Sequence, residues 1–176
     1  MAKIFDPLEL LGPVSLYAKV IMKNLWKSKV TWDESVPIDL YSAWLSFTNQ
    51  LNLLNTLLID RRLLIDDPED VEIHGFCDAS KVGYGACLYV RSRNSDQDTI
   101  VRLICAKSRV APIKEITIPR AELCGALLLA KLYQEVQPTF RFKPAKTTFW
   151  TDSTIALQWL NKSLGSLKIF ESNRVS

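Results

Sequence analysis

The chain has 176 residues, of which 48% are hydrophobic and 23% are charged, and its formal net charge is +3. These values are typical of one globular domain with at most a small extension, and they exclude disordered and fibrous chains. The longest apolar stretch, residues 123–130, is far shorter than the roughly 20 residues that span a bilayer. The first ten residues contain two acids and no apolar segment, unlike a secretory signal. We therefore expect an intracellular protein, cytoplasmic or nuclear, with no membrane partner.

The histidine and cysteine content restricts the possible chemistry. The four cysteines form no CxxC pair, so we expect free thiols in a reducing compartment. His74 is the only histidine, which excludes the common two- or three-histidine zinc sites. It precedes Asp78 by four residues on an expected strand, a separation of about 13 Å, so we expect a structural role for it. Carboxylates remain as the groups most suited to catalysis.

The first third of the chain has the periodicity of helices. Residues 14–25 repeat apolar side chains at helical spacing, and a second helix with a broad apolar stripe is expected over residues 37–58. Residues 66–72 contain five acids and no base, which indicates a solvated linker. We therefore expect a small helical segment over residues 1–67 and a second domain over residues 68–176.

The second part has the pattern of an α/β domain. Strands are expected at 71–77, 84–91, 100–106 and 147–151, and helices at 120–134 and 153–161. The polar stretch 92–98 is expected to be a hairpin loop. The order β-β-β-α-β-α implies a mixed sheet, antiparallel first and parallel later. Gly125 in the long helix indicates close packing, and Trp44, Trp150 and Trp159 are expected in the core.

Three acids lie at positions where an acid is unusual. Asp78 and Asp152 each end an apolar strand, and Glu122 lies in the first turn of an apolar helix. Neighbouring parallel strands would bring the two aspartates together, and the helix could add Glu122. Three like charges repel, so a cation is expected, and hard oxygen ligands favour Mg²⁺ or Mn²⁺. Two such ions about 4 Å apart suit hydrolysis of a phosphodiester.

Each acid also has a purely structural interpretation. Asp152 could cap the following helix, Glu122 is favoured near a helix N-terminus by the helix dipole, and Asp78 could lie in an ordinary turn. Taken together, their order along the chain favours a metal site.

Basic residues gather before the helix that carries Glu122. Residues 101–120 contain five basic residues and one acid. They would contact the phosphate backbone of a duplex, or else form a solvated face. Ser80 and Ser153 follow the two aspartates and could bond nucleic-acid oxygens, although capping also explains Ser153. The candidate nucleic-acid-binding residues are Ser80, Lys107, Arg109, Lys114, Arg120 and Ser153.

Three stretches around these acids carry a family resemblance. HGFCDASKVGYGACLYV, AKSRVAPIKEITIPRAELCGALLLAKL and FWTDSTIALQWL resemble the ribonuclease H segment of BEL/Pao-type retrotransposon polyproteins. The opening KIFDPLELLGPVSLYAKVIMKNLW, with Trp32-Asp33 after it, resembles the segment that follows the reverse-transcriptase palm. The resemblance implies a ribonuclease H-like fold that cuts the RNA strand of RNA–DNA hybrids with two Mg²⁺ ions. It also implies that Asp78, Glu122 and Asp152 are the first three catalytic acids and that the remainder of a polyprotein is a partner.

Two departures from the family limit this expectation. The polymerase core is absent, so DNA synthesis by this chain is not expected. The family has a fourth acid near a last helix, and Glu171 resembles the approach to that region, so we expect a site incomplete at its C-terminal end. A weakly active or inactive remnant that binds nucleic acid or protein is the alternative function. Integrases share the fold but order their acids differently, with the helical glutamate last, so the order here favours ribonuclease H.

Overall fold

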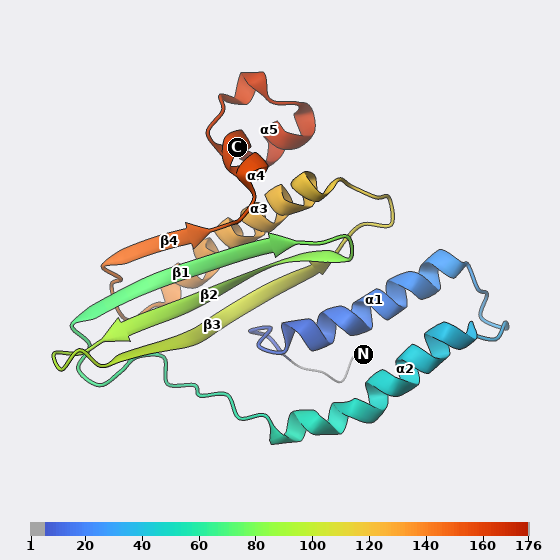
Figure 1. Cartoon of the computed structure of the whole chain (residues 1–176), viewed down its shortest axis with the longest axis horizontal. Helices are drawn as coiled ribbons and strands as arrows, with labels where there is room; N and C mark the ends of the chain where they lie inside the picture. Colours follow the sequence, from blue (N-terminus) through green and yellow to red (C-terminus); the bar gives the residue numbers. More distant parts are fainter. Residues whose placement is uncertain (1–5, 176) are drawn as a thin grey trace.

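A four-stranded mixed sheet organises the structure, a computed structural model that describes residues 6–175 (Figure 1). Residues 1–5 and 176 lie outside the description, and with them part of the stretch that we interpret as lacking a secretory signal. The strands are β1 (Asp70–Ala79), β2 (Gly83–Arg93), β3 (Thr99–Val110) and β4 (Lys146–Trp150), in the order β3-β2-β1-β4. β1 pairs with β2 and β2 with β3 antiparallel, whereas β1 and β4 are parallel. The mixed sheet predicted from the sequence is therefore confirmed.

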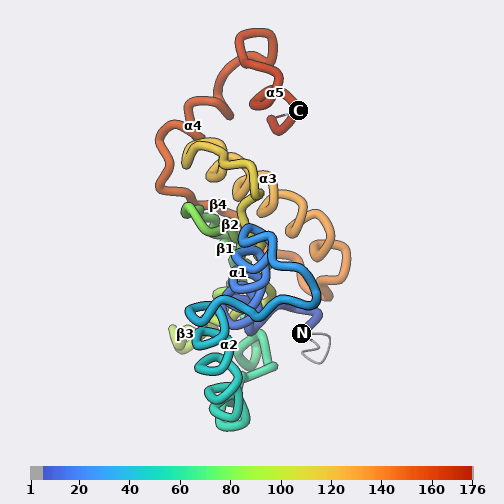
Figure 2. Tube along the Cα trace, turned by 90° about the vertical axis from the view of Figure 1, so that its right-hand side faces the viewer, coloured from blue at the N-terminus to red at the C-terminus, as the bar shows by residue number. Residues whose placement is uncertain are grey.

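One face of the sheet is covered by the long helix α3 (Ile118–Val136), as Figure 2 shows from the side. Alternation along the strands turns every second side chain toward this helix. Ile73 of β1 and Leu88 of β2 are fully buried against Leu129 and its neighbours on α3. Gly75 allows this contact, because a Cβ atom there would lie 2.7 Å from the Leu129 side chain. The core therefore lies between the sheet and α3.

The N-terminal helices lie beside the edge strand β3. α1 (Gly12–Ser28) is anchored just before its start, where the Ala106 N–H of β3 donates to the Leu8 carbonyl at 2.8 Å. α2 (Ile38–Gln50) packs on α1 but buries none of its residues. The chain continues as a 3₁₀ helix, η1 (Leu51–Thr56). The prediction of one helix as far as Leu58 is wrong, since Leu58 follows η1 and is 93% exposed.

The expected boundary near residue 68 is crossed by contacts. Leu63 and Leu64 pack against the sheet core, and the Ile65 N–H donates to the Ser92 Oγ at 2.9 Å. The acidic stretch is solvated only in part, because Glu72 belongs to β1 and pairs with Arg91 of β2 at 3.1 Å. The division into residues 1–67 and 68–176 stays a prediction.

The C-terminal part adds short helices to the end of α3. A 3₁₀ turn, η2 (Gln137–Thr139), precedes β4, and α4 (Thr154–Leu160), η3 (Leu164–Ser166) and α5 (Ile169–Val175) follow it. α5 packs against α3 and was not predicted from the sequence. Within residues 6–175, no helix combines the length and hydrophobicity that a membrane crossing requires.

The prediction that three tryptophans lie in the core is wrong. Trp150 is 50% exposed, and Trp44 and Trp159 are partly exposed. Trp150 pairs with Phe76 across β1 and β4, and both side chains lie on the face of the sheet that α3 does not cover. Trp150 was correctly predicted to lie with other apolar side chains, but the face of the sheet to which it points was not predicted correctly.

Candidate functional site

Asp78 and Asp152 occupy equivalent positions at the ends of the two parallel strands. The last paired residues of β1 and β4 are Phe76 and Trp150, and each aspartate lies two residues further along its chain. Neighbouring strands are about 4.8 Å apart, so this register directs both acids to the same edge of the sheet. Both are exposed, and the Asp78 carboxylate accepts the Ala79 N–H at 2.6 Å.

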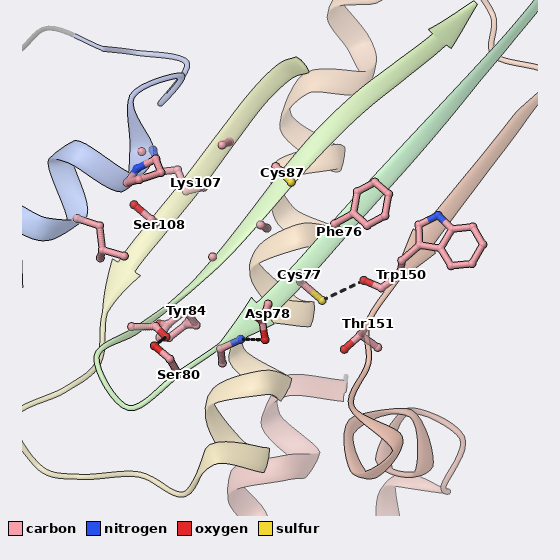
Figure 3. Close-up of a pocket in the computed structure, with 18 of the residues that line it drawn as sticks. Phe76, Cys77, Asp78, Ser80, Tyr84, Cys87, Lys107, Ser108, Trp150 and Thr151 are labelled. Atoms are coloured by element: carbon pink, nitrogen blue, oxygen red, sulfur yellow. Dashed lines mark hydrogen bonds between the residues drawn. The ribbon is translucent and has the colours of Figure 1, made fainter. Parts of the chain in front are cut away.

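The two aspartates line one open pocket of about 730 Å³ on the face of the sheet opposite α3. Figure 3 shows Phe76 and Trp150 on one side of this pocket and Lys107 and Ser108, next to α1, on the other. The same view places Asp78 at the end of β1, across from the chain that leaves β4. The pocket therefore combines an aromatic wall, a basic side chain and two carboxylates.

Glu122 is connected to this edge through Ser153. Ser153 follows Asp152 and is buried, and its hydroxyl donates to the Glu122 carboxylate. The same Oγ accepts the Ala156 N–H at 3.1 Å and so caps α4. α3 begins at Ile118, so Glu122 lies in its second turn and not, as predicted, in its first. Because Ser153 bonds to both partners, the start of α4 and this turn of α3 are held in a fixed relation.

Gly125 allows α3 to approach the end of β1. A Cβ atom at this position would lie 3.3 Å from the Asp78 carbonyl oxygen and 3.6 Å from that of Gly85. Gly125 is one helical turn after Glu122, so the same contact sets the distance between Glu122 and the strand that carries Asp78. The close packing predicted at Gly125 is confirmed.

The two aspartates also act on a common neighbour, Cys77. Burial is the main reason that the pKa of the Cys77 thiol is raised, and the charges of Asp78 and Asp152 raise it further. A hydrogen bond with Thr151 opposes this shift. All four cysteines are free, as the sequence predicts.

The carboxylates are chemically suited to a hard metal ion, although they are not gathered into one cluster. Within residues 6–175, no group of three or more His, Cys, Asp or Glu side chains is close enough to hold one metal ion. The structure brings Asp78 and Asp152 to one pocket and bonds Glu122 to Ser153 instead. Carboxylate oxygens are the ligands that Mg²⁺ and Mn²⁺ prefer, so the donor set fits these ions.

The basic residues predicted to bind nucleic acid differ in their surroundings. Lys107 lines the pocket and pairs with Glu9 at 3.5 Å, and Arg120 pairs with Glu171 at 3.0 Å. Arg109 and Lys114 are exposed, and neither has an ion-pair partner among the described residues. Arg109 and Lys114 are therefore the two with guanidinium and ammonium groups open to a ligand.

The two candidate serines are engaged within the protein. Ser80 closes the turn between β1 and β2, where its hydroxyl donates to the Gly83 carbonyl at 3.2 Å and accepts the Val82 N–H at 3.3 Å. It remains exposed and lines the pocket. Ser153 is buried and bonded to Glu122, so it belongs to the support of the acids and not to the surface.

Sequence reasoning missed a cluster of residues on α5. Phe170, Glu171 and Arg174 contact the first two turns of α3 on either side of Glu122 in the sequence. The only signal available was the helix-compatible spacing of Glu171 and Arg174, three residues apart. His74 was correctly given a structural role: its Nδ1 accepts the Trp150 Nε1–H at 3.2 Å, which links β1 to β4.

Comparison with known proteins places the chain in a family. The model of the Pao retrotransposon-like RNaseH-like domain matches residues 1–153, which includes both the helices before the sheet and all three candidate acids. A search of curated proteins gave no match. This family is of nuclease type, and ribonuclease H-like domains bind nucleic acids. The four-stranded mixed sheet with α3 across it is the α/β arrangement of such a domain. The chain therefore belongs to the family of Pao retrotransposon-like RNaseH-like domains.

Proposed function

We propose that the chain is a metal-dependent endonuclease of ribonuclease H type that acts on the RNA strand of RNA–DNA hybrids. The observation that carries this proposal is the shared register of Asp78 and Asp152, two residues beyond the last pair of the parallel strands β1 and β4. Acids at adjacent ends of parallel strands provide the paired carboxylates that divalent-ion hydrolysis requires. The family match supports a nuclease, and the donor set supports Mg²⁺ or Mn²⁺.

Asp78 and Asp152 would hold the ions together with Glu122. When bound, two such ions supply an activated water and stabilise the leaving oxygen of the phosphodiester. Neighbouring residues of the chain fix where these carboxylates lie. Ser153 orients Glu122, and Gly125 keeps α3 close to Asp78.

The nucleic acid would be held by basic residues of β3 and the loop after it. Arg109 and Lys114 are exposed, and Lys107 lies in the same pocket as the two aspartates. Contacts of these groups with phosphates are independent of base sequence and weaken as salt displaces them. A further partner is the remainder of a polyprotein, which the Pao family relationship supports.

A binding remnant without turnover is the second candidate. It is favoured by the observation that, in the described part of the chain, three carboxylates do not gather around one point. Mg²⁺ tolerates missing or displaced ligands poorly, so a chain with loosely placed acids would bind nucleic acid through its basic residues without cutting it.

Cleavage of a labelled RNA–DNA hybrid separates the two candidates. The chain is incubated with the hybrid in Mg²⁺ and, separately, in Mn²⁺, and the products are resolved on a gel. Asp78→Asn is the blank, and Asp96→Asn, which replaces an exposed aspartate in the β2–β3 loop, is the matched control. The endonuclease proposal requires RNA-strand products from the parent and from Asp96→Asn but not from Asp78→Asn. Binding of the hybrid with no cleavage above the blank would establish the remnant.

A further inference from the structure

Two arginines enclose the ring of Phe170 where α5 meets α3. The Arg120 Cζ lies 4.7 Å from the ring centroid and the Arg174 Cζ lies 3.6 Å from it. Arg120 also donates from Nε to the Glu171 carboxylate at 3.0 Å, and Glu171 is only 4% exposed. Arg174 donates to the Cys124 Sγ at 3.2 Å and to the Phe170 carbonyl at 2.9 Å. These contacts fasten a seven-residue helix that is too short to be stable alone.

The residues that α5 contacts lie on the side of α3 opposite to Glu122. Arg120 and Cys124 are four positions apart, so they share one face of the helix. Glu122 is two positions from each, a rotation of about 200° at 3.6 residues per turn. α5 therefore contacts the back of the turn whose front carries Glu122, and Glu122 on that front bonds to Ser153.

We propose that α5 is a brace for Glu122, and that Phe170, Glu171 and Arg174 are positioning residues that act through Arg120 and Cys124. The brace holds the first two turns of α3 against the start of α4, which keeps the Glu122 carboxylate on Ser153 beside Asp152. The effect of the brace on metal binding rests on the proposed function, whereas its effect on the α3 turn does not.

The contacts in this cluster require these particular side chains. A buried carboxylate requires a charged partner, and the second carboxylate oxygen of Glu171 has no hydrogen-bond partner, so its pairing depends on Arg120 alone. A planar guanidinium stacks on an aromatic ring and donates in its own plane at the same time, which an ammonium group does not do. Arg120 and Arg174 each perform both tasks, and both stack on the ring of Phe170.

Hydrogen–deuterium exchange of the full chain tests the brace. The variants are Phe170→Leu and Arg174→Gln, and Glu135→Gln, an exposed acid near the other end of α3, is the matched control. We expect the amides of residues 121–124, the first that are bonded within α3, to exchange about tenfold faster in both variants, while β1, β2 and the control remain as in the parent. Unchanged exchange at residues 121–124 in both variants would overturn the proposal, and so would a uniform increase that includes the sheet.

A second experiment links the brace to the acids: the thermal midpoint of each protein is measured at increasing Mn²⁺ concentrations. We expect the variants to need several-fold more Mn²⁺ than the parent for the same shift, and the control to match the parent. Faster exchange at residues 121–124 with unchanged Mn²⁺ dependence would overturn the proposal that Phe170, Glu171 and Arg174 position Glu122. A parent that shows no Mn²⁺ response would refute the proposed function, and the exchange result would still decide whether α5 braces the turn.

Discussion

The Ser153 hydroxyl donates to the Glu122 carboxylate, although the two residues are 31 positions apart in the chain. This bond joins the second turn of α3 to the start of α4. The residue that supports Glu122 therefore directly follows a second candidate acid, Asp152. A serine that could serve only as a helix cap thus also fixes the direction of a carboxylate. The site depends on the contact between these two helices as much as on the strand ends.

Replacing Ser153 with alanine removes both of its bonds. Loss of a serine cap costs about 1 kcal/mol, and the partly buried bond to Glu122 adds a similar amount, so we expect a loss of roughly 2 kcal/mol in the free energy of unfolding. Urea denaturation measures it. Ser153→Thr, which retains the hydroxyl, should stay close to the parent. An alanine variant as stable as the parent would mean that the bonds of Ser153 do not contribute to the free energy of unfolding.

Replacing Gly125 with alanine forces α3 away from β1. The added Cβ atom would lie 3.3 Å from the Asp78 carbonyl oxygen, which belongs to the backbone and yields little. Overpacking of this kind costs about 1–3 kcal/mol, more than the roughly 1 kcal/mol that alanine gains in helix propensity. We therefore expect a lower thermal midpoint for Gly125→Ala. Gly165→Ala, where nothing lies within 4 Å, is the control, and equal midpoints for the two variants would contradict the packing account.

Glu72 makes stability depend on pH in the acid range. Its hydrogen bond with His74 is the main cause that lowers its pKa below the usual 4.5, and Arg91 contributes in the same direction. A carboxyl whose pKa is lower in the folded state stabilises the protein above pH 4.5, and this stability is lost as the pH falls through the folded-state pKa. Glu72→Gln should therefore be less stable than the parent near neutral pH, with a difference that shrinks in acid.

Unfolding free energies at a series of pH values from about 3 to 7 measure this difference. Glu69→Gln, at an exposed acid just before β1, provides the control and should follow the parent curve throughout. A Glu72→Gln difference that is constant with pH would show that the hydrogen bond with His74 and the ion pair with Arg91 do not favour the charged form of Glu72.

Much of the fold could be predicted from alternation and helical spacing. β1 and β2 alternate apolar and polar residues, and Gly125 was correctly interpreted as a contact, because these signals are local and strong. The direction of Trp150 was missed, since alternation on a short edge strand such as β4 does not say which face the core occupies. α5 was missed because its helix is held by Arg120 and Cys124, some 50 residues earlier in the chain.

The candidate site was predictable only in part. The strand ends that carry Asp78 and Asp152 follow from the expected parallel pair, and the structure gives them the same register. The hydrogen bond from Ser153 to Glu122 could not be predicted from the sequence. A serine is equally suited to cap a helix and to bond a carboxylate on another helix, so its presence does not distinguish the two roles. The ion pairs of Lys107 with Glu9 and of Arg120 with Glu171 join distant segments, so spacing gave no sign of them.

The proposed function requires Asp78, Glu122 and Asp152 to hold a divalent cation together, and a thermal melt in millimolar Mn²⁺ and Mg²⁺ tests this requirement most directly. The ion should raise the thermal midpoint of the parent, because binding to the native state relieves repulsion between the carboxylates. Asp78→Asn and Asp152→Asn should each melt higher than the parent without metal and lose the response to the ion, whereas Asp96→Asn should retain it. A midpoint that rises equally in the parent and in both asparagine variants, or in none of them, would contradict the site.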